Sequence, residues 1–152
     1  MTKPVLFCYD GSDGSRAALH AAGELVRHPA DAVVLVVWMP AAVSLVRAGS
    51  FLTAVPNEGE IDEQEAALAK RIAEEGAAHA REHGYDASPR VARADVSVVG
   101  TIGEIAQEID ASLIVCGQRG RGAIRSTLLG SVSHGISGHA QRPVLIVPEH
   151  FG

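Results

Sequence analysis

The chain has 152 residues, of which 47% are apolar and 20% charged, and its formal net charge is −5. This length and composition are typical of one soluble globular domain with a substantial core. The mildly acidic balance argues against non-specific nucleic-acid binding, which needs a basic surface. The longest apolar run, residues 33–39, is too short to span a bilayer, and the first twelve residues do not resemble a signal peptide. We therefore expect a single domain over residues 1–152, located in the cytoplasm.

Runs and spacings of apolar residues predict strands that alternate with helices. The segments expected to be strands are continuous apolar runs such as VVLVVW, whereas Ala18, Ala22 and Leu25 repeat at helical spacing. In chain order we predict a strand at 4–9, a helix at 12–28, a strand at 32–39, a helix at 60–84, a weaker strand at 88–98, a helix at 102–111, a strand at 112–117, a helix at 130–140 and a strand at 143–148. Residues 40–60 are predicted to form an irregular loop, long enough to have a functional role.

This alternation predicts an α/β fold of the flavodoxin-like or Rossmann-like kind, because strands buried on both faces need helices on both sides. We expect a five-stranded parallel sheet in the order 3-2-1-4-5. In such sheets ligands bind at the carboxyl ends of the strands, where the strand order reverses. The first and fourth strands are neighbours at that point, so the residues that follow them form the candidate site.

A glycine-rich segment, GQRGRGAIRSTLLGSVSHG at residues 117–135, follows the fourth predicted strand. Gly117 and Gly120 have no Cβ, which would let a ribose or a phosphate approach the backbone closely. Gly130 and Ser131 stand at the predicted start of the last helix, where unpaired N–H groups favour an anion. The spacing Gly-x2-Gly-x9-Gly-Ser therefore favours a ribose and phosphate site. It differs from both the P-loop and the G-x-G-x-x-G motif.

Polar side chains accompany these glycines. The Ser133 hydroxyl adds a donor beside Ser131, and Arg119 and Arg121 are candidate countercharges for a phosphate. Asp10, in the turn after the first strand, is expected to face the same crevice. Taken alone, Asp10 is also explained by an Asx turn before the first helix.

The segment GQRGRGAIRSTLLGSVS resembles the G-x2-G-x9-G-[ST] nucleotide motif of the universal stress protein family. YDGSDGSRAAL is similar to that family's first strand and turn, VVLVVW to its second strand, and HAQRPVLIVP to its last strand with the preceding loop. The similarity covers essentially the whole chain. It implies a five-stranded parallel α/β domain, usually dimeric, that binds ATP or a related adenine nucleotide.

The resemblance also implies roles for individual residues. Asp10 should bond the ribose or adenine end, Val37 should line the adenine pocket, and Gly117 should lie against the ribose. The phosphates should be held by Gly120, Gly130, Ser131 and Ser133. The full set of nucleotide-binding residues that we expect is Tyr9, Asp10, Val37, Cys116, Gly117, Arg119, Gly120, Gly130, Ser131, Val132 and Ser133, with Mg²⁺ as a companion of ATP.

Several classes of function are compatible with this site. The first is a regulatory protein of the stress response, which binds ATP and acts through nucleotide occupancy and its dimer or partner contacts. The alternatives are a slow ATPase or self-phosphorylating enzyme that uses the same pocket, and an AMP- or cyclic-AMP-binding module. We find no dedicated catalytic residues or metal site in the sequence. A homodimer is expected through the strand at 143–148, whose apolar edge would otherwise stay unpaired.

Two pairs of residues have both a structural and a functional interpretation. Cys8 and Cys116 show no metal-ligand spacing and are expected to be free thiols in the core, although a redox pair on adjacent strands is the alternative. His79 and His83 stand four residues apart on a helix, a spacing that can bind a metal. No third ligand stands out, so a solvated helix face is the expectation for these histidines.

Overall fold

Five parallel strands form one sheet in the order β3-β2-β1-β4-β5, as predicted from the sequence. In this computed structural model, which describes residues 2–26, 31–49, 54–120 and 130–150, the strands are β1 (Val5–Cys8), β2 (Asp31–Trp38), β3 (Asp86–Arg93), β4 (Leu113–Gly117) and β5 (Val144–Val147). The order reverses between β1 and β4, which pair directly from Val5 with Leu113 to Phe7 with Val115. The candidate site is therefore at the carboxyl ends of β1 and β4.

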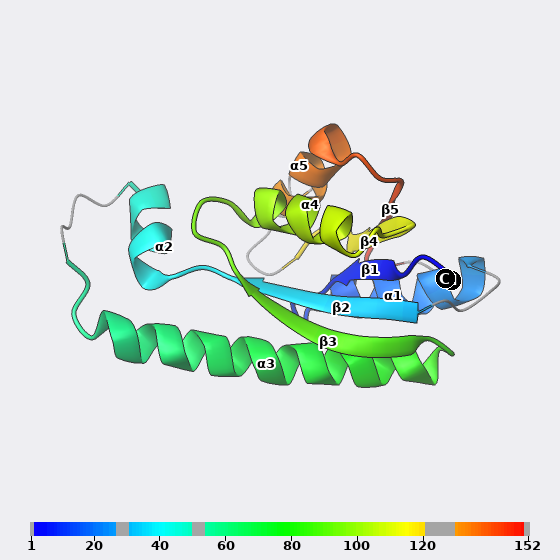
Figure 1. The fold of residues 1–152 in the computed structure, drawn as a ribbon, viewed down its shortest axis with the longest axis horizontal. Helices are drawn as coiled ribbons and strands as arrows, with labels where there is room; N and C mark the ends of the chain where they lie inside the picture. The colour runs from blue at the N-terminus through cyan, green and yellow to red at the C-terminus, as the bar shows by residue number, and fades with distance from the viewer. Residues whose placement is uncertain (1, 27–30, 50–53, 121–129, 151–152) are drawn as a thin grey trace.

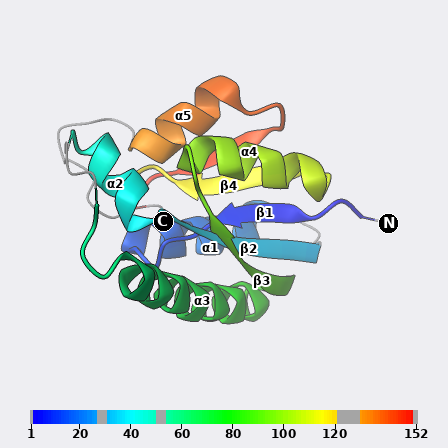
Figure 2. The same ribbon diagram turned by 60° about the vertical axis from the view of Figure 1, so that its left-hand side comes forward.

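Helices cover both faces of this sheet (Figures 1 and 2). They are α1 (Asp13–Leu25), α2 (Ala41–Arg47), α3 (Glu58–Glu82), α4 (Val98–Glu108) and α5 (Ser131–His139). Figure 1 shows α3 along one side of the sheet, and α4 and α5 on the other. The helix α1 shares the side of α3, because its buried alanines belong to the same apolar cluster as those of α3.

Strand periodicity divides the core into two halves. Phe7 of β1 and Tyr9, the residue after the strand, face the cluster formed with α1 and α3, while Leu6 and Cys8 face the cluster formed with α4 and α5. Successive side chains of a strand point to opposite faces, so a strand inside the sheet must be apolar at every position. This is the physical reason why the strand segments read as continuous apolar runs.

The predicted irregular loop at residues 40–60 is wrong in part, because α2 occupies Ala41–Arg47 and α3 begins at Glu58. The sequence AAVSLVR contains good helix formers, and Pro40 stands at the N-cap, where its missing N–H costs nothing. The Ala41 backbone N–H also donates to Asp62 Oδ1 at 2.9 Å. None of the residues of α2 is fully buried.

Two elements between residues 86 and 111 have other bounds than predicted. The strand β3 ends at Arg93 rather than at residue 98, and α4 spans Val98–Glu108 rather than 102–111. The reason is the N-cap of α4: the Ser97 hydroxyl accepts a hydrogen bond from the Gly100 N–H at 2.9 Å. This cap starts the helix four residues earlier than the apolar spacing suggested.

Among the residues that the structure describes, no helix is long and apolar enough to cross a membrane.

Candidate functional site

The turn between β1 and α1 places Asp10 at the centre of the candidate site. Asp10 Oδ1 accepts a hydrogen bond from the Ser12 backbone N–H at 2.9 Å, which confirms the predicted Asx turn. Gly11 has a φ of 79°, a conformation that glycine adopts without strain. The Ser12 side chain then accepts from the Ser15 N–H at 3.2 Å and caps α1. Hydrogen bonds within the chain therefore define the conformation of this turn.

The other carboxylate oxygen of Asp10 lies against the glycine loop that follows β4. A Cβ added to Gly120 would lie 2.5 Å from Asp10 Oδ2, far inside van der Waals contact. Of Gly117, Gly120 and Gly130, Gly120 is the one that the Asp10 carboxylate approaches. Two segments more than one hundred residues apart in sequence meet here, as expected from the position of the two strands.

Gly117 contacts the protein's own backbone. A Cβ at Gly117 would lie 2.7 Å from the Gly14 carbonyl oxygen, and a Cβ at Gly14 would collide with the Arg119 carbonyl oxygen. The end of β4 therefore packs directly against the first turn of α1. Gly117 is required for this packing whether or not a ribose also lies beside it.

Gly14 is a site residue that sequence reasoning missed. Gly14 stands in the first turn of α1, where a glycine does not by itself indicate that another segment approaches it. The contact with the Arg119 carbonyl oxygen depends on the tertiary structure.

The start of α5 is tied to the same loop. The Gly130 N–H donates to the Gln118 carbonyl oxygen at 2.8 Å, and Ser133 Oγ lies 2.7 Å from that oxygen and 3.1 Å from the Gly130 carbonyl oxygen. Ser133 is only 2% exposed. The Ser133 hydroxyl is therefore engaged in hydrogen bonds with backbone carbonyl oxygens. Ser131, the first residue of the helix, is exposed. The first N–H groups of a helix have no intrahelical acceptor, so this end of α5 is suited to an anion.

The remaining predicted site residues fall on two sides of the sheet. Val37 and Val132 are partly buried and pack on the α4 and α5 side, together with Cys8. The Tyr9 ring is on the opposite side, packed among the residues of α1 and α3. The Tyr9 ring therefore lies on the opposite side of the sheet from Val37 and Val132.

The two cysteines are free thiols, as predicted. Burial raises the pKa of Cys116 to about 11, and burial together with the neighbouring Cys116 raises the pKa of Cys8 well above its usual value. Both thiols are therefore protonated at neutral pH, which makes them poor nucleophiles and poor metal ligands.

Charged groups near the loop are partly engaged with one another. Arg119 forms an ion pair with Glu149 at 3.8 Å, and its side chain is 25% exposed. Arg121 lies outside the described residues. Within the described ranges, no cluster of three or more His, Cys, Asp or Glu residues could hold a metal ion. His79 contacts Glu75 and Glu82, while the His83 ring stacks edge-on with His20, so these two histidines have separate partners.

A parallel five-stranded sheet in this order, with helices on both faces, defines a flavodoxin-like α/β domain. The chain belongs to the universal stress protein family, whose family model matches residues 1–148. The universal stress protein YxiE of Bacillus subtilis is 35% identical over 97% of this chain and 99% of its own length. Universal stress proteins of Mycobacterium tuberculosis and Mycobacterium bovis are 40% identical over 52 residues, a segment that spans 16% of their length.

Solved structures of universal stress proteins share this fold. UspA from Lactobacillus plantarum superimposes with a TM-score of 0.73 at 23% identity, covering 95% of this chain and 97% of its own. A universal stress protein in complex with cAMP gives a TM-score of 0.60 at 23% identity, covering 97% of each chain. A third, from Archaeoglobus fulgidus in complex with dAMP, gives 0.65 at 23% identity, covering 95% of this chain and 97% of its own.

Proposed function

We propose that this protein is a cytoplasmic ATP-binding regulator of the stress response, which acts through nucleotide occupancy and through its dimer or partner contacts. The observation that carries the proposal is the proximity of Asp10 to Gly120. It places a carboxylate beside a loop position that has no side chain. The start of α5 is hydrogen-bonded to the same loop through Gly130. An acceptor for hydroxyl groups and N–H donors for phosphates are thus contiguous.

The residue roles in this proposal follow the chemistry of each group. The Asp10 carboxylate accepts hydrogen bonds from the ribose hydroxyls or the adenine, and Val37 supports the adenine ring. The backbones of Gly117 and Gly120 lie along the ribose and the first phosphate, while the α5 start at Gly130 and Ser131 binds the outer phosphates, accompanied by Mg²⁺. Val132, Ser133, Cys116, Arg119 and the Tyr9 backbone complete the wall around the nucleotide. The complexes of relatives with cAMP and dAMP support an adenine nucleotide as the ligand.

Two other candidates use the same site. An AMP- or cyclic-AMP-binding module is favoured by those two complexes, because both ligands carry a single phosphate. A slow ATPase releases phosphate steadily with added Mg²⁺, whereas a self-phosphorylating enzyme transfers the γ-phosphate of ATP to its own chain and releases ADP. Binding with neither reaction supports the regulator, sustained phosphate release supports the ATPase, and a gain in protein mass of one phosphate supports self-phosphorylation.

The first experiment is to purify the protein without added nucleotide, denature it, and identify any released small molecule by mass spectrometry. Titration calorimetry with ATP, ADP, AMP and cyclic AMP then ranks the ligands on the same preparation. Tightest binding of ATP supports the proposal, whereas tighter binding of AMP or cyclic AMP favours the monophosphate module. If none of the four ligands binds and none is released, the nucleotide proposal is wrong, and the glycines serve only turns and packing.

We also propose that the protein forms a homodimer through β5 and its flanking prolines, residues 143–148. The strand β5 is at the edge of the sheet, and Val144, Leu145 and Ile146 are apolar and only partly buried. The opposite edge, β3, contains Pro89, Arg90 and Arg93, residues that discourage pairing with another strand. Of the two edges, β5 is therefore the one suited to a second copy of the chain.

The dimer is tested by placing a lysine on each edge of the sheet in turn. Within β5, Val147 is unsuitable for this substitution, because it is 2% exposed and packs in the core with α1. A charge there would unfold the protein. Ile146→Lys should shift the protein toward the monomer in sedimentation velocity, because a charge on an apolar edge opposes pairing. Ser88→Lys, at an exposed position of β3, is the control and should leave the oligomeric state unchanged. A dimer that survives Ile146→Lys would place the interface elsewhere.

A further inference from the structure

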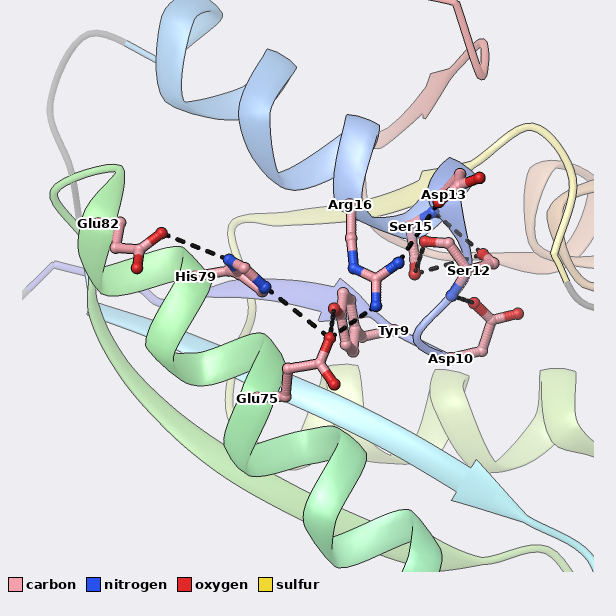
Figure 3. Close-up of polar contacts among 9 residues, drawn as sticks. All are labelled: Tyr9, Asp10, Ser12, Asp13, Ser15, Arg16, Glu75, His79 and Glu82. Carbon is pink, nitrogen blue, oxygen red and sulfur yellow. Dashed lines mark hydrogen bonds and ion pairs between the residues drawn. The ribbon is translucent and has the colours of Figure 1, made fainter.

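One carboxylate oxygen on α3 holds both ends of the turn that carries Asp10 (Figure 3). Glu75 Oε1 accepts a hydrogen bond from the Tyr9 hydroxyl at 3.1 Å and from Arg16 Nη2 at 2.8 Å. Tyr9 is the residue immediately before Asp10, and Arg16 follows the turn in α1. The segment between these two anchors contains the Asx turn and the Ser12 cap.

The Tyr9 anchor is rigid. The side chain is 3% exposed, and its ring fills the space beside Gly76 of α3, where a Cβ would lie 2.6 Å from the ring. Its backbone N–H donates to the Leu35 carbonyl oxygen of β2 at 2.9 Å. Tyr9 is therefore fixed by packing and by hydrogen bonds at both its backbone and its hydroxyl, so the position of Asp10 depends on where α3 holds this ring.

The Arg16 anchor is charged and partly exposed. Arg16 Nη1 lies 3.4 Å from Asp13 Oδ1, within the first turns of α1, while Nη2 reaches across to Glu75. The hydrogen bond from Arg16 lowers the pKa of Glu75, and burial together with Glu75 raises the pKa of Tyr9 to about 12. At neutral pH the cluster is therefore an ionised Glu75 between a neutral phenol and a guanidinium, with His79 Nε2 at 3.8 Å on its outer side.

We infer that Glu75 is a positioning residue for the nucleotide site: through Tyr9 and Arg16 it fixes the turn at residues 10–15, and so it sets the affinity for the nucleoside part of the ligand. This inference rests on the proposed function. Glu75 acts from the α3 side of the sheet and touches no proposed ligand group itself. Because the turn carries Asp10 and not the α5 start, loss of Glu75 weakens the contact with ribose or adenine and leaves the phosphate contacts in place.

The test compares Glu75→Gln with Glu74→Gln, which makes the same change at the adjacent exposed carboxylate of α3. Glu74 forms no ion pair within the part of the chain that the structure describes. Calorimetry with adenosine, AMP and ATP should show an affinity reduced about fivefold by Glu75→Gln, by the same factor for all three ligands. Glu74→Gln should match the wild type. The equal factor excludes an effect confined to the phosphate contacts, and an unchanged melting temperature excludes a general loosening of the fold, which would also weaken all three ligands alike.

Tyr9→Phe removes only the hydroxyl and serves as a second variant if Glu75→Gln fails to fold. The single Tyr9→Phe variant should also weaken all three ligands equally. A double variant of Tyr9→Phe with Glu75→Gln should bind little more weakly than Glu75→Gln alone, because both changes break one cluster. Circular dichroism melting without nucleotide reports the folded state of each variant.

The outcomes separate this inference from the proposed function. A wild type that binds none of the three ligands overturns the proposed function and removes the basis of the inference. A wild type that binds, beside folded Glu75→Gln and Tyr9→Phe variants of unchanged affinity, overturns the inference alone. A loss confined to ATP would also overturn it, because the effect would then belong to the phosphate contacts.

Discussion

The two ends of the parallel sheet are built in different ways. At the carboxyl ends, backbone meets backbone: Gly117 packs against Gly14, and only glycine fits at either position. At the amino ends, side chains form ion pairs, with Asp110 bound to Lys3 at 2.9 Å and to Arg142 at 2.6 Å. Backbone segments in close contact cannot shift to make room for an added atom. Exposed ion pairs join flexible side chains, and each of them contributes little to stability. The relative positions of strands and helices are therefore defined more tightly at the end of the sheet that carries the candidate site.

The largest effect should come from Gly117→Ala. The new Cβ would lie 2.7 Å from the Gly14 carbonyl oxygen, and neither backbone can move without displacing β4 or α1. We expect the free energy of unfolding in urea to fall by about 2 kcal/mol. Gly103→Ala is the control, because its Cβ meets nothing within 4 Å in the middle of α4, and it should stabilise the protein by roughly 0.5 to 1 kcal/mol. Equal stabilities of the two variants would contradict the rigid contact at the carboxyl end.

Gly120→Ala should separate binding from stability. Its Cβ would meet Asp10 Oδ2 at 2.5 Å, but this atom is the end of a side chain that can rotate away. We expect the free energy of unfolding to change by less than about 1 kcal/mol. ATP affinity by calorimetry should fall about tenfold, because Asp10 leaves the position from which it bonds the nucleotide. Gly138→Ala on α5, where the Cβ meets no neighbouring atom, should bind ATP like the wild type. An undiminished affinity in Gly120→Ala would mean that Asp10 does not bond the nucleotide.

The smallest effect should come from Asp110→Asn at the amino ends. Hydrogen bonds from Lys3 and Arg142 lower the pKa of Asp110, so its stabilisation is complete above its unfolded pKa of about 4 and is lost as the pH falls through the folded value. Asparagine tolerates the left-handed backbone of this position, where φ is 51°. Thermal melts should show the variant slightly less stable than the wild type at pH 7, with the difference vanishing toward pH 2. ATP affinity should be unchanged, and a loss of affinity would mean that the two ends of the sheet are coupled.

Much of the fold could be predicted because its causes are local. Continuous apolar runs identified the strands, and a helical spacing of apolar residues identified α1. The errors came where a hydrogen bond outweighed the pattern of apolar residues, once through a local cap and once through a tertiary contact. The Ser97 cap moved the start of α4, and Asp62, 21 residues away in sequence, holds the first N–H of α2. The second contact is tertiary, and no window of sequence around Pro40 contains it.

The candidate site was predicted in part, for a similar reason. The glycine spacing and the Asp10 turn are sequence patterns, and the strand order that joins them follows from the alternation of elements. The sequence could not show that Ser133 bonds the Gln118 carbonyl oxygen, since every residue has a carbonyl and its partner depends on how α5 meets the loop. It also could not show that the Tyr9 ring faces α3 rather than Val37.

By itself the sequence determined the class of fold, the order of its elements and the segments that form the site, because burial and chain connectivity act on runs of residues. Only the tertiary structure decided which glycines are required by backbone packing, such as Gly14 and Gly117, and which lie beside a side chain, such as Gly120. Only the tertiary structure brought Glu75 to the turn of Asp10. These contacts depend on how helices pack across the sheet, and that packing is set by side chains distant in sequence acting together.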